Sequence, residues 1–94
     1  MSDENKDDGA VLNDEFELTL RSSVSMGGIE YESIKLCEPT ALQIDQFTKD
    51  IEKVGAISAQ IKFISSNASF PEAAAKKLKA RDFKEAVDYL ANFL

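Results

Sequence analysis

Histidine and tryptophan are absent from this sequence of 94 residues, and cysteine occurs once. Without histidine the chain lacks the commonest general base and the commonest metal ligand in proteins. A zinc site of cysteine and histidine is therefore excluded, and so are Ser-His-Asp and Cys-His nucleophiles. The single Cys37 cannot form an internal disulfide, and we expect it to be a small residue at the end of a strand. We expect no catalytic residue, no cofactor and no metal site.

Long hydrophobic runs are also missing. No stretch of 18 apolar residues exists, so no segment is expected to span a membrane. The first five residues, Met1-Ser2-Asp3-Glu4-Asn5, are acidic and lack the apolar core of a signal peptide. The sequence therefore predicts a cytoplasmic protein.

The formal net charge of −6 is concentrated at the N-terminus. Residues 1–15 hold six acidic groups and one basic group (1 − 6 = −5), and the rest hold ten basic and eleven acidic groups (10 − 11 = −1). Residues 1–14 show no periodic apolar pattern, so we predict a disordered acidic tail there. Residues 15–94 are then a single, nearly neutral domain.

Alternating hydrophobic residues predict a β-hairpin over residues 15–37. The alternation is strict in the first strand, at Phe16, Leu18 and Leu20. Gly27-Gly28 is expected to form the turn, because glycine readily takes the positive φ that tight hairpin turns need.

The second strand changes the parity of its hydrophobic residues between Tyr31 and Ile34. A strand keeps one face buried only while the alternation is regular. The change predicts a bulge near Glu32-Ser33, a twist, or two short strands in succession.

From Pro39 onward hydrophobic residues recur every three or four positions, which predicts helices. Thr40 is expected to cap the first helix, and Gln43 completes a capping box. The apolar pattern continues past Gly55, so one kinked helix over 41–66 competes with two helices over about 41–53 and 56–66. We favour two helices, because a straight helix over 41–66 is long for so small a domain.

Two shorter helices are predicted over about 71–79 and 83–94. Pro71 suits the start of the first. Asp82, followed by Glu85, is expected to cap the second as another capping box. The fold class is therefore α+β: an N-terminal β-hairpin followed by a small bundle of three to four α-helices.

A basic cluster precedes the last helix, at Lys76, Lys77, Lys79, Arg81 and Lys84. Nucleic-acid binding usually needs a net basic domain with interleaved aromatic residues, and this domain has neither. We interpret the cluster as a solvated helix face and loop, and we expect no nucleic-acid partner.

In the order of these features the chain resembles the small tail assembly chaperones of contractile-tailed phages, the group that includes the Mu-like and P2-like tail proteins. The likeness covers about residues 15–94. In many relatives an arginine stands where this chain has Cys37. The matching residues are Phe16-Glu17-Leu18-Thr19-Leu20, Gly27-Gly28, Ile34-Lys35-Leu36-Cys37-Glu38-Pro39-Thr40, Leu78 and Asp82-Phe83.

The resemblance implies a protein that is not an enzyme. Such chaperones bind the tape measure protein, a long helical and aggregation-prone chain, and keep it soluble in the host cytoplasm while tail tube subunits gather around it. A minor tail or head-completion protein retained in the virion is the alternative. A hydrolase using Asp45 and Glu52 is a third idea, although carboxylates seven residues apart on a helix are ordinarily solvated surface groups.

The helix predicted over 83–94 is the expected partner surface. On a helix that turns by about 100° per residue, its hydrophobic residues cover an arc of roughly 200°. A helix that only covers one side of a core needs an apolar stripe of about 100°. One edge can face the domain and the other a partner helix; burial of the whole arc, in the fold or in self-association, is the alternative. We expect self-association in any case, because a hairpin has open edges. The expected partner-binding residues are Phe83, Ala86, Val87, Tyr89, Leu90, Phe93 and Leu94.

Overall fold

The computed structural model of the chain describes residues 14–94, so the predicted disordered tail lies outside the described residues except for Asp14. It confirms the α+β class, with a hairpin followed by four helices. The elements are β1 (Glu15–Met26), β2 (Ile29–Cys37), α1 (Ala41–Val54), α2 (Ala56–Ala68), α3 (Glu72–Ala75) and α4 (Ala80–Ala91).

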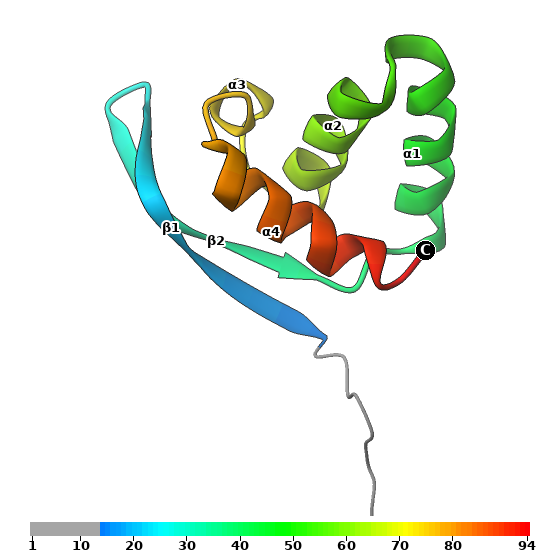
Figure 1. Cartoon of the computed structure of the whole chain (residues 1–94), viewed down its shortest axis with the longest axis horizontal. Helices are drawn as coiled ribbons and strands as arrows, with labels where there is room; N and C mark the ends of the chain where they lie inside the picture. The colour runs from blue at the N-terminus through cyan, green and yellow to red at the C-terminus, as the bar shows by residue number, and fades with distance from the viewer. Residues whose placement is uncertain (1–13) are drawn as a thin grey trace, which may run out of the picture.

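The hairpin is a long curved ribbon, and the helices lie on its concave side (Figure 1). α4 runs along β1 and β2, α3 packs near the turn end of β1, and α2 contacts both α4 and β2. α1 lies farthest from the hairpin and, within the described chain, packs on α2 alone. The domain therefore has a firmly packed inner part and one peripheral helix.

Gly27 and Gly28 form the predicted turn. Their φ angles are 59° and 81°, and the flanking residues Met26 and Ile29 pair across the hairpin. Positive φ at both central residues is the hallmark of a type I′ turn, whose twist matches that of the strands.

The ladder is irregular opposite Glu32. Thr19 pairs with Ser33, and the next recorded pair is Val24 with Tyr31, so residues 20–23 of β1 face the single residue Glu32. The sequence located this irregularity along the ladder, but the extra residues belong to β1 and not to the second strand. The backbone of β1 leaves the ladder here because its amides bond to the last helix, as described below.

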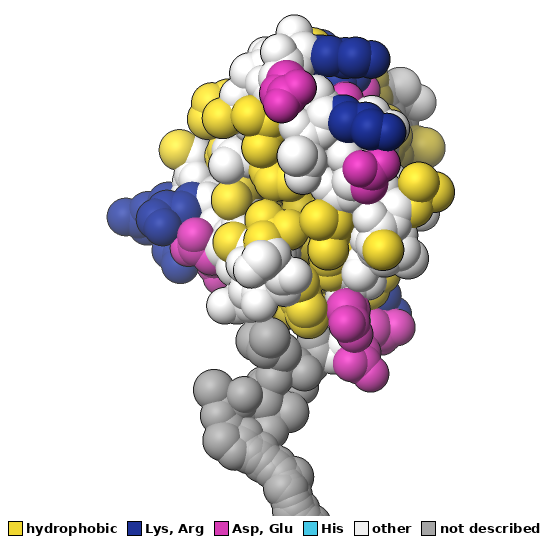
Figure 2. All heavy atoms as spheres, turned by 90° about the vertical axis from the view of Figure 1, so that its right-hand side faces the viewer, with side chains coloured by type: hydrophobic (Ala, Val, Ile, Leu, Met, Phe, Trp, Pro, Cys, Tyr) yellow, Lys and Arg dark blue, Asp and Glu magenta, His cyan; other side chains and the backbone are white. Residues whose placement is uncertain are grey.

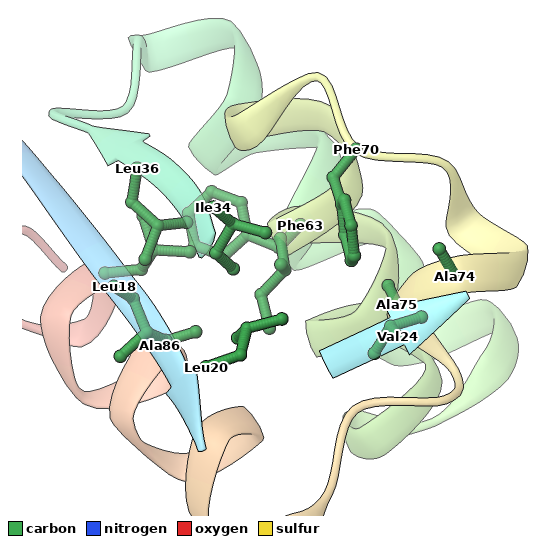
Figure 3. Close-up of a cluster of buried hydrophobic side chains, with 12 residues drawn as sticks. Leu18, Leu20, Val24, Ile34, Leu36, Phe63, Phe70, Ala74, Ala75 and Ala86 are labelled. Carbon is green, nitrogen blue, oxygen red and sulfur yellow. The ribbon is translucent and has the colours of Figure 1, made fainter. Parts of the chain in front are cut away.

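The hydrophobic core lies between the concave face of the hairpin and α2, α3 and α4 (Figure 3). Hydrophobic pairs on both sides of the irregularity point to this face, which explains the parity change in β2. The buried members are Leu18, Leu20, Val24, Ile34, Leu36, Phe63, Ile64, Phe70, Ala74, Ala75, Ala86 and Leu90.

Thr40 caps α1 as predicted. Its Oγ1 accepts from the backbone N–H of Gln43 at 3.1 Å, and its own N–H donates to Gln43 Oε1 at 3.3 Å. Both halves of the capping box are therefore formed.

We expect Thr40→Ala to lower the free energy of unfolding by about 1 kcal/mol, because the N–H of Gln43 loses its acceptor. Thr40→Ser keeps a hydroxyl at the same place and serves as the control, with a much smaller expected loss. Urea denaturation followed by circular dichroism measures both. Equal losses for the two variants would contradict a role for the hydroxyl.

Gly55 separates α1 from α2, which confirms the predicted break. Its φ of 92° and ψ of 166° belong to a region that is essentially restricted to glycine. Three hydrophobic residues near this corner, Ile51, Val54 and Ile57, are exposed.

The last two helices differ from their predicted bounds. α3 ends at Ala75 instead of about 79, because Lys77 and Leu78 bond three residues back and the chain turns. α4 runs from Ala80 to Ala91 instead of over about 83–94, with Lys79 at the N-cap position and no side-chain cap. The predicted Asp82 cap is therefore wrong. Its carboxylate is bonded elsewhere.

Candidate functional site

A hydrophobic groove lies between α1, α2 and the second half of α4. Its lining is almost free of polar groups, with Gln60 as the exception: Phe47, Gln60, Phe63, Val87, Leu90, Ala91 and Leu94. Figure 2 views the molecule from the side on which α1 and the C-terminus lie, and a band of hydrophobic side chains runs down this face between charged groups. We call these seven residues the apolar groove.

Two stacked aromatic rings form the wall on the α1–α2 side. The rings of Phe47 and Phe63 are 4.6 Å apart between centroids and inclined by 18°. Phe63 is buried in the core, whereas Phe47 is half-buried and belongs to a helix with no buried residue. The stack therefore fixes the peripheral helix to the core while one part of the Phe47 ring remains at the surface.

Asn67 holds the far end of this wall in place. Its Oδ1 accepts from the N–H of Cys37 at 2.9 Å, and its Nδ2 donates to the carbonyl of Cys37 at 2.9 Å. Nδ2 also donates to Gln43 Oε1 at 3.1 Å. The buried amide thus joins the end of β2, the start of α1 and the end of α2.

The predicted partner-binding residues of α4 and its C-terminal turn divide into two groups. Ala86 and Leu90 are buried in the core, and Phe83, Val87, Tyr89 and Phe93 are half-buried. Leu94 has 61% of its surface exposed. Val87, Leu90 and Leu94 line the apolar groove, so the groove holds three of the seven predicted residues.

Tyr89 lies on the hairpin side of α4. Its ring stacks on Phe16 of β1 at 5.2 Å and meets Phe93 edge-on at 5.3 Å. Burial is the main cause that raises the pKa of Tyr89 above 10, and the neighbouring Cys37 and acidic groups raise it further. The phenol is therefore neutral at physiological pH. This edge of the helix is occupied by the hairpin, and the opposite edge borders the groove.

Asp82 fixes α4 against the hairpin. The side chain is fully buried, and its carboxylate accepts from the N–H of Arg21 at 3.0 and 3.1 Å and from that of Ser22 at 3.3 Å. These amides belong to the irregular part of β1, which explains why they are absent from the ladder. The negative charge also sits in the first turn of α4, where it is favourable to the helix dipole.

The sequence analysis did not assign the residues that α1 and α2 contribute to the groove. Phe47 recurs between Ile44 and Ile51 in the apolar pattern that predicted the helices, whereas Gln60 and Phe63 fall outside that pattern. Their position depends on how α2 packs on α4, which no local pattern specifies.

The arrangement is suited to contact with a hydrophobic surface. The groove has no charged lining residue, and no group of three or more cysteine, aspartate and glutamate side chains within residues 14–94 is placed to hold a metal ion. None of the helices in that range is both long and apolar enough to cross a bilayer.

Comparisons with known proteins identify a family for nearly the whole domain. The family described as "Phage tail assembly chaperone proteins, E, or 41 or 14" matches residues 17–94. No curated protein and no solved structure gave a significant match. The match spans β1 to the C-terminus and includes every lining residue of the apolar groove.

Proposed function

Because the chain belongs to the phage tail assembly chaperone family, we propose that it binds the tape measure protein of its phage and keeps that protein soluble while the tail assembles. The apolar groove is the observation that carries this proposal. It lies on a structured domain and ends in a largely exposed leucine, Leu94. Helix-in-groove recognition needs such a surface for the apolar face of an amphipathic helix.

The proposed role is binding without catalysis, in the host cytoplasm. The tape measure protein is the main partner, and the tail tube protein is a second. Self-association is part of the proposal, because the described sheet has two strands and therefore an open edge on each side.

Co-expression with the neighbouring tape measure gene, followed by affinity purification, tests the proposal. We expect wild type to co-purify with the tape measure protein and Leu94→Asp to lose most of it, because a charge at the mouth of the groove opposes contact with an apolar helix. The exposed position of Leu94 should leave the melting temperature almost unchanged.

Ile29→Asp is the matched control. Ile29 is an isoleucine of similar exposure, 55%, next to the hairpin turn and outside the groove lining. It should leave co-purification intact. Failure of wild type to co-purify would overturn the proposed function, and equal losses for both variants would exclude the groove as its site.

A further inference from the structure

A second hollow opens where α2, α3 and the start of α4 meet. One part is lined by Ile57, Ile61, Ala75, Lys76, Leu78, Ala80 and Phe83. The adjoining part is lined by Val54, Ser58, Ile61, Lys62, Glu72 and Lys76. Because Ile61 and Lys76 line both parts, they form one continuous surface, which we call the basic hollow.

The floor of the basic hollow is hydrophobic and uncovered. Ile57 and Ile61 are four residues apart on one side of α2, and Val54 at the end of α1 adjoins them in the lining. Ile57 has 61% of its surface exposed and Val54 has 46%. An exposed apolar surface of this kind can take the apolar face of an amphipathic helix.

The charge beside this floor is positive and not neutralised. Lys76 is in the lining, whereas Lys79 and Arg81 follow it in the chain and line neither part of the hollow. Within residues 14–94 none of these three cations forms an ion pair, whereas Lys62 pairs with Glu72 at 3.4 Å and Lys84 with Asp88 at 3.0 Å. Lys76 therefore places an unpaired positive charge beside the apolar floor, in a chain whose net charge is −6.

We propose that the basic hollow docks an amphipathic helix whose apolar stripe is flanked by aspartate or glutamate. The stripe contacts Ile57, Ile61 and Phe83, and the acidic flank pairs with Lys76. The inference rests on the proposed function, which supplies the helical partner. The apolar floor favours a protein over a single-stranded nucleic acid, because Phe83 is the one aromatic residue in the lining and such binding relies on several stacked rings.

Two labelled synthetic helices test this proposal by fluorescence anisotropy with the full chain. They share one apolar stripe and differ in the flank, which is glutamate in one and lysine in the other. We expect the full chain to bind the glutamate helix at least tenfold more tightly at low salt, with a difference that shrinks as salt screens the charges. Lys76→Glu should weaken binding of the glutamate helix about tenfold.

Lys49→Glu is the control for net charge, because Lys49 is exposed on α1 and pairs with Asp45 at 3.1 Å, outside the hollow. It should change the affinity less than threefold. Equal affinity for the two helices, or equal effects of the two substitutions, would overturn the proposal. An oligonucleotide that binds more tightly than the glutamate helix would also overturn it.

The same variants separate this inference from the proposed function. If wild type and Lys76→Glu co-purify equally with the tape measure protein, the proposed function stands and the basic hollow has no part in it, which overturns the inference. If wild type binds the glutamate helix but no tape measure protein, the proposed function fails and the chemistry of the hollow is supported. A dimer that Lys76→Glu dissociates would identify a second copy as the occupant and overturn the partner proposed here.

Discussion

Asp82→Ala is expected to lower the free energy of unfolding by about 3 kcal/mol, since two backbone N–H groups lose their bonds to a buried, charged carboxylate and a hydrogen bond to a charged group contributes about 1.5–3 kcal/mol. Those amides belong to Arg21 and Ser22, in the irregular part of β1, where no pairing with β2 is recorded. For a domain of this size the loss corresponds to roughly 12–24 °C in melting temperature. Differential scanning calorimetry and urea denaturation measure it.

Asp88→Ala is the control on the same helix. Asp88 is exposed and pairs with Lys84 four residues earlier, an interaction typically worth about 0.3–0.5 kcal/mol. Asp82→Asn should fall between the two, because the amide keeps one acceptor oxygen but turns a donor toward the strand amides. If Asp82→Ala were as mild as Asp88→Ala, the contact between α4 and the hairpin would not depend on this carboxylate.

Asn67→Asp is expected to lower the free energy of unfolding by about 3 kcal/mol at neutral pH, because a buried carboxylate replaces the amide donor and faces two acceptors. The acceptors are the carbonyl of Cys37 and Oε1 of Gln43. The substitution is nearly isosteric, so the loss reports the hydrogen bonds and not a cavity. Urea denaturation at pH 7 measures it.

The loss should depend on pH in a defined direction. Burial beside two acceptors raises the pKa of the introduced carboxyl above its unfolded value of about 3.9. The protonated acid can donate to the Cys37 carbonyl, so its contribution is retained at low pH and lost as the pH rises through the folded pKa. Ser66→Asp places the same charge one residue earlier at an exposed site and should show neither the loss nor this pH dependence.

The features that the sequence predicted correctly are set by neighbouring residues. Thr40 and Gln43 form a capping box because they are three residues apart on one turn. Gly27-Gly28 turns the hairpin, and Gly55 breaks the helix, because glycine takes the positive φ found at both places. Alternation alone also located the hairpin at residues 15–37, which are the outer bounds of β1 and β2.

The features that the sequence did not predict depend on distant residues. Asp82 followed by Glu85 has the local pattern of a capping box, yet its carboxylate bonds to a strand 61 residues earlier. Asn67 belongs to no pattern that predicted a structural role, and its place in the fold comes from Cys37, 30 residues away. A buried polar group shows which backbone groups it satisfies only when the chain is folded.

The sequence predicted one side of the candidate site. The wide apolar arc of the last helix identified Val87, Leu90 and Leu94, which line the apolar groove. The opposite side comes from Phe47 and Phe63, which meet across the Gly55 corner. The apolar pattern of a helix does not predict the angle between that helix and the next. The basic cluster was recognised, but the apolar floor beside Lys76 is formed by residues of α2.

The bond between Asp82 and β1 also sets an order of events during synthesis. Arg21 leaves the ribosome 61 residues before Asp82, and at about 5–20 residues per second this separation is roughly 3–12 s. Throughout that interval the concave face of the hairpin lacks α4, and a two-stranded hairpin is barely stable alone. Neighbouring ribosomes on one messenger therefore present unfinished hairpins with open edges side by side. Strand pairing with a sister chain is therefore easiest during this interval, before α4 has packed on the hairpin.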